Sequence, residues 1–159
     1  MKISIISIGK IKESYLTEAI NEYLKRLTPY CKINITEILE EKINDNPSEK
    51  DKQNVILKEG EKILSKTDDK SYIIALDVKG VNISSEELAE KIDTLKLAGQ
   101  SHLTFIIGGP FGLSNKVKEK ASFKLSFSKM TFTHQMIRLF LLEQIYRAFK
   151  ISKNEKYHW

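Results

Sequence analysis

The sequence predicts an α/β fold, a mostly parallel sheet with helices on both faces, formed by a single domain over residues 1–159. Short, continuously apolar runs such as 3–8, 72–77 and 103–109 alternate with longer stretches of helical spacing. Strands that are apolar on both sides are typical of a parallel sheet covered by helices. With 159 residues, 41% of them hydrophobic, the chain has enough apolar material for one core.

The first half of the chain alternates strands with helices. Residues 3–8 predict a buried strand, a helix begins near Ser14, and residues 32–39 predict a second strand with weak polar contrast. The charged stretch 40–53 predicts a mobile loop leading into an outer helix that Ser48 can cap.

The second half continues this alternation. After the strand 72–77, a capping box at Ser84 opens the next helix. The strand 103–109 ends in glycines, and a short helix from about Ser114 and a strand over 123–127 follow it.

The last predicted helix, residues 134–151, is apolar on nearly every side. Its apolar side chains cannot all face one sheet, so the helix needs two apolar partners. One partner is the sheet, and we expect the other to be a second subunit, which makes the protein a homodimer. A helix sunk deeper in the monomer is the alternative.

The charge is concentrated at one end of the chain. Residues 116–159 carry ten Lys or Arg against three Asp or Glu, whereas residues 1–115 carry sixteen against eighteen. This asymmetry fits a polyanionic partner such as RNA, and equally a solvated lysine-rich surface. Cys31 is the only cysteine, and neither a signal peptide nor a long apolar run is present. We therefore expect a cytoplasmic protein with no metal site and no membrane contact.

The stretch "FIIGGPFGL", residues 105–113, has three glycines directly after an apolar strand. Glycines at the carboxyl end of a parallel strand permit a tight turn or a close approach of a ligand to the backbone. The pattern is neither the dinucleotide fingerprint nor a P-loop, which disfavours a phosphate cradle. A plain glycine-rich turn is the equal alternative.

Two further stretches are candidate walls of a pocket. Asp77 ends a strand and is expected to form a local turn, with the Leu76 backbone as a pocket edge. The segment 126–135 mixes hydroxyl and apolar side chains, which suits an adenosine-like ligand, although Thr131 or Thr133 can simply cap the next helix.

Two arginines lie on the apolar C-terminal helix and need anionic partners there. Glu143 stands four residues before Arg147, so a helix-surface ion pair is the simpler account of that arginine. Arg138 needs a carboxylate or a phosphate as its partner.

Four stretches together resemble a known family: "LDVKG", "FIIGGPFGL", "SFSKMTFTHQMIRLFLLEQIYRAFKI" and the closing "YH". In order and spacing they resemble the ribosomal RNA large subunit methyltransferase H family of the SPOUT superfamily. The resemblance implies a homodimer with a C-terminal deep trefoil knot, an exception to the avoidance of knots. It also implies S-adenosylmethionine as methyl donor and N3-methylation of a pseudouridine in 23S rRNA on the assembled ribosome.

The family's site residues carry over by position. The resemblance implies a cofactor site formed by Leu76, Gly108, Gly109, Phe127, Ser128, Lys129, Met130, Thr131 and Phe132. Arg147 and His158 match positions that serve the acceptor, with Tyr157 beside them, and His158 is the candidate base or orienter. The chain departs from the family at Thr133, where proline is usual, and at Trp159, where a terminal Lys or Arg is usual.

Two rival functions come from other classes of protein. A small nucleotide-dependent oxidoreductase is disfavoured by the absent dinucleotide fingerprint. A non-catalytic ribosome- or RNA-binding module on the same fold suits the basic C-terminal end equally well.

Overall fold

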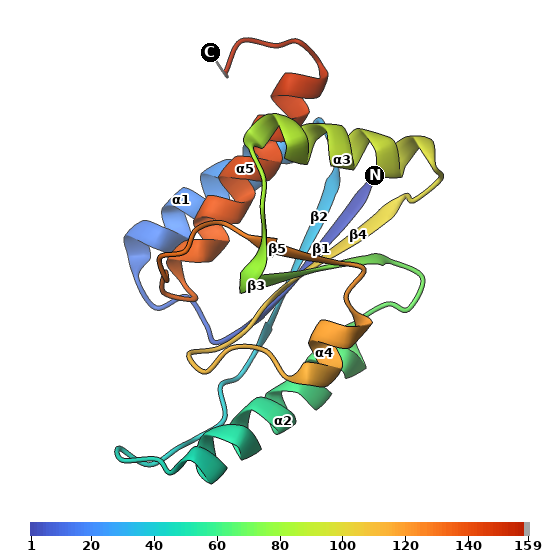
Figure 1. The fold of residues 1–159 in the computed structure, drawn as a ribbon. Coiled ribbons are helices and arrows are strands. Elements are labelled where there is room, and N and C mark those ends of the chain that lie inside the picture. The colour runs from blue at the N-terminus through green and yellow to red at the C-terminus, as the bar shows by residue number, and fades with distance from the viewer. Residues whose placement is uncertain (158–159) are drawn as a thin grey trace.

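The computed structural model describes residues 1–157 and shows five parallel strands that alternate with five helices over that range (Figure 1). The strands are β1 (Lys2–Ile8), β2 (Lys32–Ile38), β3 (Tyr72–Asn82), β4 (His102–Ile107) and β5 (Phe123–Ser126). The helices are α1 (Ser14–Leu27), α2 (Glu49–Lys66), α3 (Ser85–Leu97), α4 (Asn115–Lys120) and α5 (Met136–Ser152). The predicted α/β class is confirmed.

The strands form one sheet in the order β2-β1-β4-β3-β5, and every pairing is parallel. Because β5 lies beside β3 and not beside β4, the chain must cross back over β3 to reach the edge of the sheet. This order is compatible with the trefoil knot, which stays a prediction. The pairing of β3 with β5 shifts register between Leu76 and Val81, so β3 is irregular where it passes the end of β5.

Alternate residues of the strands feed two apolar cores, one on each face of the sheet. On one face, residues such as Ile5 and Phe105 pack with α1, α3 and α5, and on the other, Ile6 and Ile106 pack with α2 and α4 (Figure 1). Because both faces are covered, the central strand β4 is buried at every position after His102, whereas the edge strand β2 carries polar residues.

Capping residues start three of the helices. The Ser48 hydroxyl accepts from the backbone N–H of Asp51 and the Ser84 hydroxyl from that of Glu87, so both form capping boxes, and Ser114 opens α4 in a similar way. The predicted loop over 40–53 was too long, because the Ser48 cap starts α2 at residue 49.

Helix α5 packs on the sheet and contacts both α1 and α3. Its Tyr146 ring meets the rings of Tyr23 and Tyr30 edge-on, and Phe149 stacks on Tyr30. Neighbours within the chain therefore cover much of this apolar helix, which is the alternative to a second subunit. Near its start the helix keeps exposed apolar surface at Met136.

Candidate functional site

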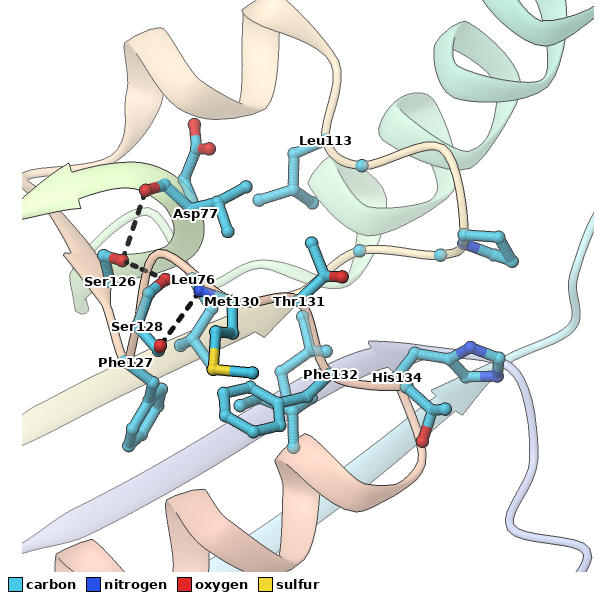
Figure 2. A pocket seen from close by; sticks show the side chains of 18 of the residues that line it. Leu76, Asp77, Leu113, Ser126, Phe127, Ser128, Met130, Thr131, Phe132 and His134 are labelled. Carbon is cyan, nitrogen blue, oxygen red and sulfur yellow. Dashed lines mark hydrogen bonds between the residues drawn. The ribbon is translucent and has the colours of Figure 1, made fainter.

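A cavity of about 630 Å³ opens at the carboxyl ends of β3, β4 and β5, within the size range of small-molecule sites. Three walls enclose it (Figure 2). They are residues 76–78 of β3, the loop after β4, and the segment that joins β5 to α5. Its lining residues are Leu76, Asp77, Val78, Ile107, Gly108, Gly109, Pro110, Phe111, Gly112, Leu113, Leu125, Ser126, Phe127, Ser128, Met130, Thr131, Phe132, Thr133, His134, Gln135 and Ile137.

The wall after β4 is the glycine loop, residues 108–112. A Cβ on Gly108 would lie 2.9 Å from the carbonyl carbon of Gly112, and a Cβ on Gly109 would lie 3.0 Å from Ile8 Cγ2. Gly112 has a φ of +86°, which side chains rarely adopt. The glycines are thus required because the loop folds on itself and packs on β1. The sequence had suggested a different reason, the close approach of a ligand to the backbone. The resulting main chain still lines the cavity.

The β3 wall is fixed by Asp77. Its Oδ1 accepts the backbone N–H of Lys79 at 3.1 Å, which is the expected local turn, and its Oδ2 lies 2.9 Å from Lys118 Nζ. Burial raises the pKa of Asp77, but the hydrogen bonds from Lys118 and the Lys79 backbone outweigh it and lower the pKa overall. The carboxylate is therefore already paired and serves to shape the wall beside Leu76.

The third wall is the segment 127–135. The Ser126 hydroxyl lies 3.2 Å from the carbonyl oxygen of Val78 and 3.1 Å from that of Ser128, and the Ser128 hydroxyl accepts the backbone N–H of Met130 at 2.9 Å (Figure 2). These bonds hold the first half of the segment against the β3 wall. Met130 is 74% exposed and Phe132 is also exposed, so the cavity presents apolar side chains at its rim.

The second half of the segment leads into α5 through Thr133. Its hydroxyl accepts the backbone N–H of Met136 at 3.3 Å, and its carbonyl accepts that of Ile137. The capping alternative for Thr133 is therefore correct. The threonine gives the helix start a hydrogen bond that proline, with no side-chain acceptor, does not offer.

The segment and the start of α5 are tied to the ends of β1 and β2 by polar contacts. Arg138 is 1% exposed and donates to Glu37 at 2.7 Å and to the Ile8 carbonyl at 2.9 Å. His134 Nε2 lies 3.0 Å from Glu40 Oε1. The anionic partner that Arg138 required is thus a carboxylate from β2, so this arginine belongs to the support of the site.

Arg147 and Tyr157 come together in a separate cluster near the C-terminus. Arg147 donates to Glu143 at 2.6 Å and lies over the Tyr157 ring, 4.8 Å from its centroid. The Tyr157 hydroxyl lies 3.1 Å from that of Tyr23 and donates to Glu143 at 3.2 Å. Neither Arg147 nor Tyr157 lines the cavity of the described chain. His158 lies outside the described residues.

The electrostatics of this cluster keep both groups in their protonated forms. The hydrogen bond to Glu143 raises the pKa of the Arg147 guanidinium. Burial, followed by the hydrogen bond with Tyr23, raises the pKa of the Tyr157 hydroxyl well above its usual value. Tyr157 therefore suits a role as hydrogen-bond donor and orienter better than a role as base.

The structure brings together all the expected cofactor residues except Lys129, which is absent from the cavity lining. Sequence reasoning missed other lining residues, including Phe111, Leu113 and Ile137. Phe111 and Leu113 lie within the glycine motif, so their position in that motif could have identified them as lining residues. Ile137 was assigned to the helix core, and only the approach of α5 to the cavity gives it a second role.

Among residues 1–157 no helix has the length and apolarity needed to cross a membrane. Within that same range no group of three or more His, Cys, Asp or Glu side chains is arranged to hold a metal ion.

An all-parallel sheet with an apolar cavity at the carboxyl ends of its strands defines a small-ligand-binding α/β protein. A family model described as "Predicted SPOUT methyltransferase" matches residues 1–158. The chain is 56% identical over 158 residues, 99% of both chains, to ribosomal RNA large subunit methyltransferase H of Carboxydothermus hydrogenoformans. The protein of that name from Clostridium botulinum strain Alaska E43 gives the same identity and coverage.

A solved structure of a probable methylase family protein from Haemophilus influenzae shares the fold. Its TM-score is 0.56 at 16% identity, and the match covers 99% of this chain and 70% of that one. The chain therefore belongs to the SPOUT methyltransferases, in the ribosomal RNA large subunit methyltransferase H family that its sequence resembles.

Proposed function

We propose that this chain is an S-adenosylmethionine-dependent methyltransferase that methylates N3 of a pseudouridine in 23S rRNA. It acts as one SPOUT domain over residues 1–159, in a cytoplasmic homodimer, on the assembled ribosome. The observation that carries the proposal is the cavity, because nearly all residues that the family resemblance implies for the cofactor meet there. The relatives' name, ribosomal RNA large subunit methyltransferase H, supports the class of substrate.

The cavity fits an adenosine-containing donor. It combines apolar side chains such as Leu76, Leu113 and Phe132 with glycine main chain, whose amides and carbonyls can recognise a base edge. Its one aspartate, Asp77, is paired to Lys118, so the lining adds no unpaired carboxylate to attract a metal. The residues that would hold the donor are Leu76, Gly108, Gly109 and the segment from Phe127 to Phe132, with Lys129 at its margin.

S-adenosylmethionine, when bound, would supply a methyl group that the acceptor nitrogen takes as the C–S bond breaks and neutral S-adenosylhomocysteine leaves. The protein's task is to align the acceptor nitrogen and to exclude water. The apolar rim at Met130 and Phe132 would exclude water, and Arg147 with Tyr157 would orient the acceptor nucleotide. His158 would receive or direct the N3 proton.

The basic C-terminal end supports an RNA acceptor. Arg147, Lys150 and Lys153 lie on or next to α5, and each is positioned over a tyrosine ring, so the region combines cations with aromatic surface. This pairing suits a single-stranded nucleotide, whose base can stack on an aromatic ring while a nearby cation neutralises its phosphate.

Calorimetry and ribosome methylation test the proposal together. S-adenosylmethionine should bind with heat saturating at one site per cavity, while NADH should give no heat. Mass spectrometry of 23S rRNA should show one additional methyl on a pseudouridine only in cells that have the protein. Failure to bind any adenosylmethionine analogue would favour the non-catalytic binding module instead.

We expect Arg147→Ala to reduce kcat on ribosomes by ~10²-fold while the Kd for S-adenosylmethionine stays nearly constant, because Arg147 lies outside the donor cavity. Arg26→Ala is the matched control, since Arg26 also pairs with a glutamate one turn away and lies over a tyrosine ring. Equal losses of donor binding and turnover in Arg147→Ala would contradict the assignment.

A further inference from the structure

Glu59 is a buried carboxyl group that the proposed mechanism does not use. It projects from α2, and Glu59 as a whole is only 3% exposed. Its Oε1 accepts the backbone N–H of Glu41 at 3.1 Å, and its Oε2 has no hydrogen-bond partner among residues 1–157. A buried acceptor without a partner is costly and calls for an explanation.

The unpaired oxygen lies directly behind the glycine loop. A Cβ built on Gly109 would come within 2.9 Å of Glu59 Oε2, so any larger residue there would have to displace this carboxyl group. Gly109 also lines the cavity. The loop is therefore held between Glu59 on one side and the cavity on the other, so a change in the protonation of Glu59 would act at a wall of the site.

The surroundings of Glu59 disfavour its ionised form. Burial is the largest cause, and the nearby carboxylates of Glu40 and Glu41 add to it, so the pKa of Glu59 is raised above 4.5. Two groups oppose this: the hydrogen bond from the Glu41 backbone and the charge of Lys62, which itself pairs with Glu41. Lys58 also pairs with Glu41, and His134 faces Glu40, so neither gives Glu59 a cation of its own.

We propose that Glu59 is a positioning residue: its uncharged carboxyl group supports the glycine loop beneath Gly109, and its ionisation displaces the loop and weakens binding in the cavity. The physical cause is that an ionised Oε2 must find a donor or water, and the loop stands where that donor or water would go. Only the identity of the ligand rests on the proposed function.

The sign of the pH dependence follows from the direction of the shift. A carboxyl group with a raised pKa in the folded state binds its proton more tightly there than in the unfolded chain. Its favourable contribution is fully present below the unfolded pKa and is lost as pH rises through the folded pKa. Loop support should therefore weaken from acidic toward alkaline pH.

Nuclear magnetic resonance tests the support without any ligand. In the wild-type chain the amide signals of Gly109 and Gly112 should titrate together with the Glu59 side-chain carboxyl carbon, with a midpoint above 4.5. Glu59→Gln should abolish that titration, and Glu61→Gln, an exposed neighbour on the same helix, should leave it unchanged. Glycine amides that do not move, or that still titrate in Glu59→Gln, would overturn the proposal.

Calorimetry at a series of pH values from 4.5 upward then tests the effect on the cavity, because the pKa of Glu59 is raised above 4.5. The Kd of S-adenosylmethionine should rise by about fivefold with pH in the wild-type chain and in Glu61→Gln, and should stay flat in Glu59→Gln. A wild-type Kd that ignores pH would refute the coupling. Absence of binding at every pH would instead refute the proposed donor, while the glycine titration would still decide the role of Glu59.

Discussion

Individual glycines of the cavity wall are required for different reasons. Gly108 and Gly109 leave no room for a Cβ, because Gly112, Ile8 and the Glu59 carboxyl group are already in contact distance. Gly112 has open space around it but a left-handed backbone, so its constraint is conformational. At the residue scale, the shape of the loop therefore depends on the lack of space at Gly108 and Gly109 and on the backbone conformation at Gly112.

This difference gives a matched pair of substitutions. Gly112 and Gly99 have φ angles of +86° and +83°, and neither has an atom of the described residues within 4 Å of an added Cβ. Each change to alanine should lower the free energy of unfolding by ~1 kcal/mol, measured by urea denaturation. Only Gly112→Ala should also weaken S-adenosylmethionine binding, since Gly99 lies after α3 and away from the cavity. Equal Kd values for the two variants would show that the loop conformation does not control the site.

At the scale of elements, the site depends on how α5 is joined to the sheet. The cavity-lining segment ends where α5 begins, and Arg138 near that point bonds to Glu37 of β2 and to carbonyls at the end of β1. These contacts connect residues more than a hundred positions apart. Arg138 therefore fixes the position of α5 relative to the carboxyl edge of the sheet, and with it the third wall of the cavity.

Removal of this buried contact should be costly. Arg138→Met leaves Glu37 and two carbonyls without their donor, and we expect a loss of ~3 kcal/mol in the free energy of unfolding by urea denaturation. The double variant with Glu37→Gln should recover part of it, because the carboxylate that has lost its cation is then removed, while the amide oxygen can still accept the Ile11 backbone N–H. The same change at Arg26, which forms an exposed pair, should leave the denaturation midpoint in place. A midpoint in Arg138→Met equal to that of the wild type would contradict the anchoring role.

At the scale of the whole molecule, one group of exposed apolar side chains lies beside the cavity. Met130, Phe132 and Met136 are exposed there, and the ring of Phe132 meets that of Phe140 on α5 at 5.3 Å. Covering this surface with a second copy would close the rim of the site and would account for the part of α5 that α1 and α3 leave open. This is the physical basis on which we propose the homodimer.

A charge placed on that surface should separate the subunits. Met136→Glu should convert the protein from dimer to monomer in sedimentation velocity at micromolar concentration, because a buried unpaired carboxylate opposes association. Leu97→Glu is the matched control, since Leu97 is 89% exposed at the far end of α3 and should leave the mass unchanged. A dimer that survives Met136→Glu, or a wild-type monomer, would rule out this face as the interface.

Local sequence determined the elements and the motif of the cavity. Apolar β-branched runs, the Ser48 and Ser84 caps and the glycine pattern act over a few residues, so the order of strands and helices could be predicted without any tertiary information. The end of β3 could not, because its extension to Asn82 depends on pairing with β5, a strand more than forty residues later.

Tertiary structure alone decided which residues meet across the sheet. Glu37 became the partner of Arg138, and Glu59 came to rest behind Gly109, because strand order and helix packing bring these distant segments together. The spacing of neighbouring residues in the sequence does not predict such contacts, because they depend on how the whole apolar core packs. Short-range patterns in the sequence thus determined which elements form and where the backbone turns, whereas long-range packing decided the charges behind the cavity wall.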